Sequence, residues 1–251
     1  MESMLIREQY KVVHVLAAQE NYAAMEAVDI QNRENNTYLL NVYEGELLKP
    51  YLRTFHELRG CSAFREMFVW HGSLVAVFRC RQGTNIDQVF YKGTQVDWQT
   101  RLTVAHALFH QALSAWEYPY RVSCATLLSV NLALVMEECP LAVNYMIPPL
   151  EEMDRRELVL LLSDQIKKVL IHRWDSPMEE RRFVRELCSG EETSAVRAYG
   201  RWMAEEPVIR AAYEKMNGMN RLSRWLHLLG VNLHDWLQIR MKQQREGGDR
   251  Q

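Results

Sequence analysis

The feature that most limits the fold of this chain is a change in hydrophobic periodicity near residue 81. Before it, short segments rich in β-branched and aromatic residues alternate with polar breaks, which indicates a meander of antiparallel strands. After it, apolar residues recur every three or four positions over long stretches, which is typical of helices. The polar segment 81–84, with Gly83, separates the two patterns. The sequence therefore predicts an α+β protein with two parts.

The first part, residues 1–82, is predicted to form a five-stranded antiparallel sheet with one helix. The strands are expected over residues 10–17, 22–30, 37–43, 66–70 and 74–80. The helix is expected over residues 47–58, where apolar side chains have helical spacing and Pro50 falls near the start, a position that tolerates proline. The predicted order is three strands, the helix and two strands.

The second part, residues 83–241, is predicted to be mainly helical, with one pair of strands around Asn131 and Asn144. Helices are expected over residues 98–116, 158–171, 176–190, 194–204, 207–216 and 221–240. The segment 158–171 is apolar on nearly every side and is therefore expected in the interior. Residues 242–251 are polar and contain two glycines, so they are predicted to be a disordered tail.

The spacing around the strand pair carries a specific motif. A kinase catalytic loop runs H-R-D, four residues, then N, followed by an apolar strand and D-F-G. Residues 124–146 follow this spacing with Asn131 at the asparagine, but Thr126 stands at the catalytic Asp and Asn144 at the metal-binding Asp. With this motif and the order of elements, residues 8–240 resemble the two-lobed protein kinase fold, with an N-terminal sheet lobe and a C-terminal helical lobe.

The resemblance implies that the other catalytic positions have also changed. Asn41 stands at the strand lysine that contacts the phosphates, and Glu57 at the helix glutamate that pairs with it. Residues 81–84 match the hinge, and the turn over residues 17–21 lacks the glycines of a phosphate-binding loop. Phosphoryl transfer depends on positioned charge, so these changes imply a catalytically inactive, pseudokinase-like protein. The architecture also distantly resembles the soluble domain of the type VII secretion pseudokinase subunit.

Charge, apolar run length and cysteine spacing limit the classes of partner and the cellular location that the sequence predicts. A net charge of −2 and a pI near 6.5 give no chain-wide attraction for nucleic acid, and no apolar stretch is long enough to insert across a membrane. Five scattered cysteines without a CxxC spacing favour reduced thiols and a cytoplasmic location. His106 and His110 have a zinc-binding spacing but no evident third ligand, so no metal and no cofactor are expected. We expect a scaffold or regulatory module that binds another protein, without nucleotide binding.

Several alternatives stay open. The chain can be an atypical nucleotide-dependent phosphotransferase that takes its carboxylates from elsewhere, such as Glu137 or Glu138. It can also be a helical structural adaptor without an N-terminal sheet. A simpler interpretation of Asn131 and Asn144 is that they satisfy backbone groups at strand ends. Glu57 is more often a solvated helix charge than an ion-pair partner, because the lysine that would pair with it is missing.

The last helices carry a further pattern. Trp225 and Trp236 are interspersed with Arg221, Arg224 and Arg240. This can be an aromatic and basic docking surface, although tryptophans in the core with arginines outside are the simpler expectation.

Overall fold

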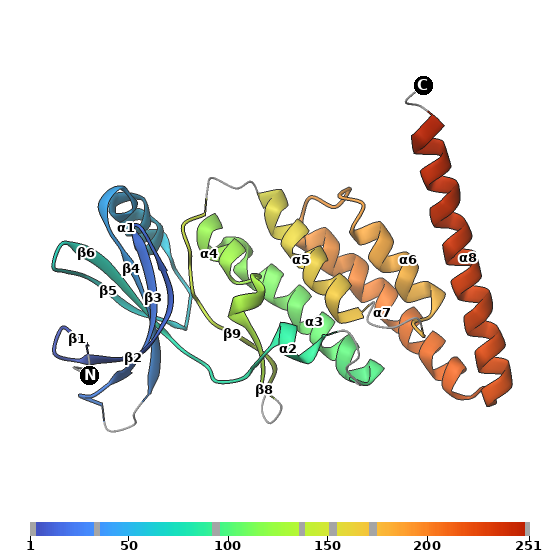
Figure 1. Ribbon diagram of the computed structural model, residues 1–251, viewed down its shortest axis with the longest axis horizontal. Coiled ribbons are helices and arrows are strands. Elements are labelled where there is room, and N and C mark those ends of the chain that lie inside the picture. The colour runs from blue at the N-terminus through green and yellow to red at the C-terminus, as the bar shows by residue number, and fades with distance from the viewer. Residues whose placement is uncertain are drawn as a thin grey trace.

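The protein has two parts that differ in architecture (Figure 1). The computed structural model describes residues 4–32, 36–91, 96–135, 139–150, 155–170 and 175–248. The N-terminal part is a curled antiparallel sheet with one helix, and the C-terminal part is mainly helical. The N-terminal sheet ends at Arg79 and the next strand begins at Thr84. The architecture therefore changes where the sequence periodicity changes.

The N-terminal sheet has six strands in the order β1-β2-β3-β4-β6-β5, with all neighbours antiparallel. The strands are β1 (Leu5–Ile6), β2 (Tyr10–Gln19), β3 (Tyr22–Asp29), β4 (Thr37–Tyr43), β5 (Phe64–Trp70) and β6 (Ser73–Arg79). Five strands were predicted, and β1 is the additional one. Two residues are too few to show a periodicity. The turn after β1 uses Arg7 and Glu8 with φ of 54° and 55°, which side-chain-bearing residues seldom adopt.

Alternation of apolar residues divides this sheet into two faces. Helix α1 (Leu48–Glu57) covers one face, against which it packs its buried residues Tyr51 and Phe55. The opposite face lines the inside of the curl, where apolar residues from all six strands pack together. The central strands are therefore covered on both faces, and β4 is buried over nearly its whole length, whereas β2 is mostly exposed.

Two glycines fix close turns of the chain. Gly72 has φ of 84° and follows His71 with φ of 48°, so this pair forms the two-residue hairpin turn between β5 and β6. Gly83 passes close to strand β8 (Leu132–Val135), where an added Cβ would lie 2.9 Å from the carbonyl oxygen of Leu134. The linker between the two parts therefore needs a residue without a side chain at position 83.

The C-terminal part combines a small sheet with a helical bundle. Strands β7 (Thr84–Asn85), β8 and β9 (Cys139–Val143) form an antiparallel sheet in that order. The helices are α2 (Ile86–Val89), α3 (Trp98–Ser114), α4 (Tyr120–Ala125), α5 (Arg155–Leu170), α6 (Met178–Leu187), α7 (Ala195–Asn217) and α8 (Arg221–Gly248). Helix α3 contacts both α5 and α7 and lies at the centre of the bundle. The apolar segment predicted to be interior corresponds to α5, although Leu160 is exposed.

Two predictions about the last helices are wrong. The two helices predicted over residues 194–216 are one helix, α7, which continues through Pro207. The tail predicted to be disordered from residue 242 is helical as far as Gly248, because α8 continues through it, and residues 249–251 lie outside the described residues. Polar composition indicated disorder there, but Lys, Gln, Arg and Glu are also strong helix formers. Among the described helices, none combines the length and apolar character needed to span a bilayer.

Candidate functional site

The segment that follows β9 is hydrogen-bonded to both parts of the protein. We call residues 144–150 the interlobe segment. It has neither helix nor strand, yet Ile147 is fully buried and Tyr145 nearly so. The backbone N–H of Asn144 donates to the carbonyl of Asn131 at 2.7 Å, which fixes where the segment begins. Buried backbone without regular structure needs other hydrogen-bond partners, and side chains of the predicted site provide them.

Asn144 pairs with the backbone of the linker. Its Oδ1 accepts a hydrogen bond from the N–H of Arg81 at 2.9 Å, and its Nδ2 donates to the carbonyl of Arg81 at 3.1 Å. Residue 144 was predicted to stand at the metal-binding Asp and residue 81 in the hinge. The carboxamide therefore ties the start of the interlobe segment to the linker and uses both its donor and its acceptor to do so.

Asn131 holds the next turn of the segment. Its Nδ2 donates to the carbonyls of Ala125 and Met146, each at 2.7 Å, and its Oδ1 accepts from the N–H of Met146 at 2.8 Å. The side chain is buried. These bonds agree with the simpler interpretation, in which Asn131 and Asn144 satisfy backbone groups at strand ends.

Asn41 connects the N-terminal sheet to the same segment. It lies on β4 and is fully buried. Its Nδ2 donates to the carbonyl of Tyr145 at 2.8 Å, while its Oδ1 accepts from the N–H of Ile147 at 2.8 Å and from the hydroxyl of Tyr22 at 3.0 Å. The residue predicted to replace the phosphate-binding lysine therefore binds backbone of its own chain.

Two tyrosines extend this contact along the segment. The hydroxyl of Tyr43 donates to the carbonyl of Ile147 at 2.7 Å, and that of Tyr51 donates to the carbonyl of Pro148 at 2.9 Å. The Tyr51 hydroxyl also accepts from the N–H of Leu150 at 3.2 Å. The two rings stack with centroids 4.0 Å apart. Burial raises the pKa of both tyrosines, so both remain hydrogen-bond donors.

Sequence reasoning missed these tyrosines as site residues. Tyr51 lies in the helix predicted over residues 47–58, where the apolar spacing indicates only a packed face. The bonds join residues about a hundred positions apart, at separations of 104 and 97, and no local pattern indicates such pairs. The available signal was a run of tyrosines on one side of a strand and a helix, which is also typical of an ordinary core.

Tyr145 adds an apolar contact to the hydrogen bonds. Its ring stacks on Phe78 of β6, with centroids 5.2 Å apart and planes 5° from parallel. Tyr145 and Ile147 belong to the same buried cluster as the face of the sheet that α1 covers. Val122 and Ala125 of α4 also belong to it. The interlobe segment is thus part of a hydrophobic core shared by the two parts.

The remaining two predicted site residues do not contact the segment through their side chains. Thr126 is fully buried, and its hydroxyl donates to the carbonyl of Ser123 at 2.7 Å, as a local cap at the end of α4. Glu57 is exposed at the last position of α1, and its side chain forms no hydrogen bond or ion pair with another described residue. The structure therefore brings together Asn41, Asn131 and Asn144, while Glu57 matches the solvated helix charge that was the alternative.

The turn between β2 and β3, predicted over residues 17–21 in place of a phosphate-binding loop, is shorter than predicted. Strand β2 continues to Gln19, which pairs with Tyr22, so the turn is only Glu20 and Asn21. Neither residue is a glycine, and Glu20 brings a carboxylate to the tip. A two-residue turn offers too few backbone N–H groups to surround a phosphate.

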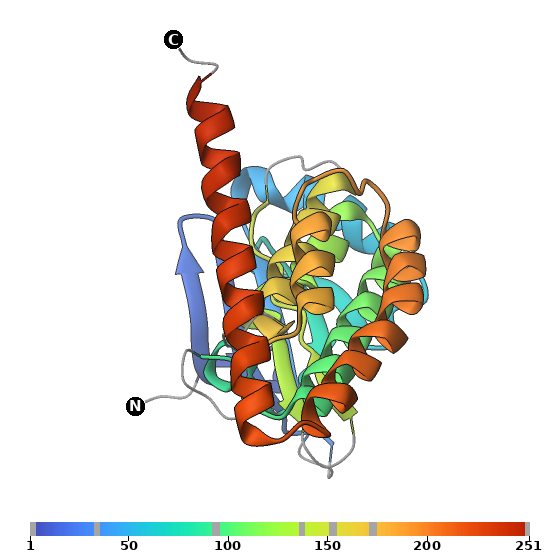
Figure 2. The ribbon, with the colours of Figure 1, turned by 90° about the vertical axis from the view of Figure 1, so that its right-hand side faces the viewer.

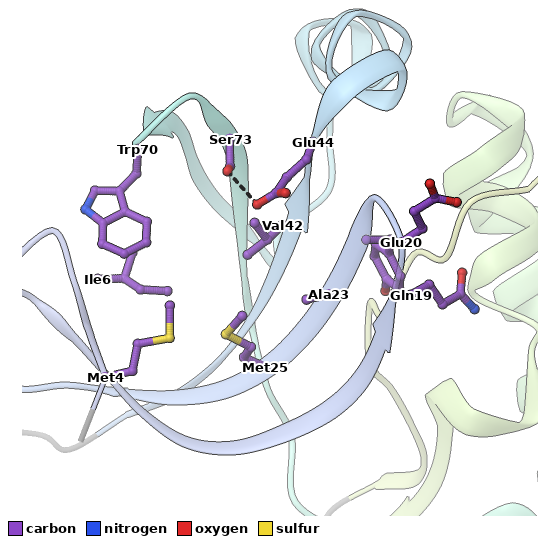
Figure 3. A pocket seen from close by; sticks show the side chains of 11 residues that line it. Met4, Ile6, Gln19, Glu20, Ala23, Met25, Val42, Glu44, Trp70 and Ser73 are labelled. Carbon is purple, nitrogen blue, oxygen red and sulfur yellow. Dashed lines mark hydrogen bonds between the residues drawn. The ribbon is translucent and has the colours of Figure 1, made fainter. Parts of the chain in front are cut away.

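A pocket of about 150 Å³ lies next to this hairpin, on the face of the sheet away from α1 (Figure 3). Its apolar side is formed by Met4, Ile6, Met25 and Trp70 inside the curl. Its polar edge includes Glu44, whose carboxylate accepts a hydrogen bond from Ser73 at 2.9 Å. The pocket is therefore separate from the interlobe segment.

Metal ligands do not gather at the candidate site. Among the described residues, no group of three or more His, Cys, Asp or Glu side chains is close enough to share an ion. His106 instead accepts a hydrogen bond at its Nδ1 from the indole N–H of Trp202 at 3.3 Å. Glu137 and Glu138, the alternative carboxylates, lie outside the described residues.

Comparison with known proteins identifies the fold. No protein-family model and no curated protein sequence matches the chain. Among solved structures, the Mycobacterium tuberculosis PknI kinase domain matches with a TM-score of 0.56 and 9% identity, covering 82% of this chain and 99% of that one. A pseudokinase in its apo form matches with a TM-score of 0.52 and 12% identity, covering 77% and 91%.

Rad53 in complex with AMP-PNP also matches, with a TM-score of 0.54 and 11% identity, covering 77% of this chain and 65% of that one. Identities this low show the fold alone. They confirm the predicted two-lobed, kinase-like fold. The alternative of a helical adaptor without an N-terminal sheet is wrong, because that sheet has six strands.

Proposed function

We propose that this protein is a catalytically inactive module of the kinase fold that acts as a scaffold or regulator by binding another protein. The observation that carries the proposal is the set of hydrogen bonds that hold the interlobe segment to the linker and to the sheet. Asn144 binds both backbone groups of Arg81, and Asn41 binds backbone on either side of Met146.

The absence of charged side chains at the predicted catalytic positions supports a lack of phosphoryl-transfer activity. Phosphoryl transfer needs a carboxylate to hold magnesium, a base for the attacking hydroxyl and a cation on the phosphates. The predicted positions for these groups hold Asn144, Thr126 and Asn41. All three side chains are already hydrogen-bonded to backbone, so binding a metal or a phosphate would first break those bonds.

The same contacts argue against nucleotide binding. A purine base is oriented in a pocket by a few backbone donors and acceptors. In the linker, the N–H and the carbonyl of Arg81 are already paired with Asn144. Tyr145 adds a stacked aromatic contact to Phe78 that a base would have to displace. A nucleotide would therefore compete with the chain's own interlobe segment.

The proposed role in protein binding rests on the outer surfaces of the two lobes. If the space between the lobes is filled, a partner has the outer surfaces of the two lobes to bind. A scaffold role in type VII secretion stays a prediction by analogy of architecture. Co-purification from the native organism would identify the partner.

Thermal unfolding in the presence of nucleotide tests the proposed lack of nucleotide binding and catalysis. The arms are ATP alone, ATP with Mg²⁺, ATP with Mn²⁺, and each metal alone, with an active kinase of similar size as the positive control. A ligand at a hundredfold excess over its Kd adds about 2.7 kcal/mol, which raises the Tm of a domain this large by several degrees. We expect no shift for this protein, and a metal-dependent shift of several degrees would overturn the proposal.

A further inference from the structure

Helix α8 has an exposed apolar face along about four turns. Its members recur at three- and four-residue spacing, and their exposed fractions range from 39% to 68%. They are Leu222, Trp225, Leu226, Leu229, Leu233, Trp236 and Leu237. We call these residues the α8 stripe. Single exposed apolar residues are common on protein surfaces, but a continuous row of this length indicates a binding surface. The simpler expectation of tryptophans in the core is wrong here.

The stripe faces away from the rest of the protein. The opposite side of α8 carries Leu228 and Val231, which are only 6% and 7% exposed. Two views show that α8, drawn in red, runs along one side of the helical part and extends beyond it at the C-terminal end (Figures 1 and 2). The covered residues and the open apolar stripe therefore lie on opposite sides of the helix.

The charge of this helix differs from that of the whole chain. The chain has a net charge of −2, but the sequence of α8 is basic. Against two acidic residues, Asp235 and Glu246, it carries Arg221, Arg224, Arg240, Lys242 and Arg245. A positive helix on an otherwise acidic protein favours an anionic partner.

The same charges argue against a second copy of α8 as that partner. Two α8 helices side by side would bring basic residues close to basic residues. In a parallel arrangement in register, Arg221 and Arg224 of one helix would lie near the same residues of the other. Like charges at such positions oppose pairing and select against self-association.

We propose that α8 binds the surface of an anionic lipid membrane and lies parallel to it. In this arrangement the stripe enters the boundary between headgroups and acyl chains, and the net positive charge of α8 favours an anionic surface. Trp225 and Trp236 are of the residue type that prefers this boundary. A helix that lies on the bilayer needs only one apolar face, so no membrane-spanning helix is required. The inference goes beyond the proposed function and does not depend on whether the space between the lobes binds nucleotide.

Flotation of the full chain with vesicles tests the proposal. Vesicles of phosphatidylcholine alone are compared with vesicles that also contain phosphatidylglycerol, at low and high salt. We expect binding to the anionic vesicles only, and weaker binding at high salt. The double variant Leu226→Glu and Leu229→Glu should lower that binding about tenfold or more, because two large apolar contacts are lost and two negative charges are added.

A matched control separates this effect from a general effect of added charge. The double variant Val196→Glu and Val208→Glu adds the same charges at exposed positions of α7, at 56% and 46% exposure, and should bind anionic vesicles like the unmodified protein. Circular dichroism establishes that all variants are folded. Failure of the folded protein to bind anionic vesicles would overturn the proposal, as would binding that the α8 variant leaves unchanged. A lipid-free dimer that only the α8 variant disrupts would also overturn it, in favour of a second copy.

Discussion

The side chain of Asn144 and the backbone of Arg81 form a matched pair of hydrogen bonds across 63 residues of sequence. The N–H of Arg81 donates to Oδ1 at 2.9 Å and its carbonyl accepts from Nδ2 at 3.1 Å. The carboxamide of Asn does not ionise, and it offers a hydrogen-bond donor and an acceptor on neighbouring atoms. This pair joins the linker between the lobes to the start of the interlobe segment.

Replacing Asn144 with Asp should therefore destabilise the protein, although Asp is the residue found at this position of an active kinase. An ionised carboxylate accepts but does not donate, so the bond to the carbonyl of Arg81 is lost and two oxygens face each other. We expect the free energy of unfolding to fall by about 1–2 kcal/mol, measured by urea denaturation. The Asp variant should still show no metal-dependent thermal shift with ATP.

Asn220 provides the matched control. Its Oδ1 accepts from the N–H of Ser223 at 2.8 Å at the start of α8, a bond that needs only an acceptor. Asn220→Asp keeps that bond and should change stability by only a few tenths of a kcal/mol. Equal effects of the two substitutions would show that the donor side of Asn144 contributes nothing.

Backbone amides of the interlobe segment should exchange slowly with deuterium. The N–H groups of Asn144, Met146 and Ile147 donate to Asn131 and Asn41, and these acceptors are buried. Slow exchange is expected for such amides even without helix or strand. Peptides covering this segment should therefore exchange as slowly as those of β4, as measured by mass spectrometry.

The exposed segment 189–192 serves as the reference for fast exchange, because it also lacks regular structure but is solvent-accessible. Exchange of the interlobe segment as fast as that of residues 189–192 would mean that the segment leaves the lobes readily. In that case the argument against nucleotide binding would fail.

Removing the hydroxyl of Tyr43 should weaken the contact between the lobes. Tyr43→Phe keeps the ring stacked on Tyr51 but leaves the buried carbonyl of Ile147 without this donor. The expected loss of stability is about 1–3 kcal/mol. Tyr91→Phe, at a residue 58% exposed, should have almost no effect in the same denaturation experiment. A loss for Tyr43→Phe no larger than that control would indicate that solvent replaces the donor.

The sequence predicts the fold better than the site for a physical reason. Strands and helices of the two lobes follow from apolar spacing, which is local, so the strands β2 to β6 and helix α1 lie close to their predicted ranges. Strand β1 has too few residues for any periodicity. The helical residues after position 241 are polar on all sides, and polarity does not distinguish an exposed helix from a disordered tail.

The site could be predicted only in part. Spacing from Thr126 located Asn131 and Asn144, and their bonds lie in the region it indicated. Their partners could not be predicted, because each Asn can bind any free backbone group and the chosen ones lie far away in sequence. Glu57 was predicted to match the helix glutamate of kinases from its position along the helix. In the structure, the face of α1 toward the sheet carries Tyr51 and Phe55, and Glu57 is not on it.

The free energy of unfolding should decrease as the pH rises, because the helical lobe contains a buried carboxyl group, that of Glu180. Glu180 is fully buried; the Tyr213 hydroxyl donates to it, and Nη1 of Arg101 lies 3.9 Å from its Oε1. Burial outweighs the attraction of Arg101 and raises the pKa of Glu180 from 4.5 to about 7. The folded state then holds the proton more tightly than the unfolded state. Its contribution to stability is full below pH 4.5 and is lost as the pH rises through about 7.

Glu180→Gln isolates this contribution, because the amide still accepts from Tyr213 but does not ionise. Between pH 4.5 and 8, the free energy of unfolding of the unmodified protein should fall by about 3 kcal/mol relative to that of the variant. Urea denaturation at several pH values measures this difference. Glu57→Gln removes the same charge at an exposed position and is the matched control. A difference for Glu180→Gln that stays constant or grows with pH would mean that Arg101 keeps the carboxylate ionised despite its burial.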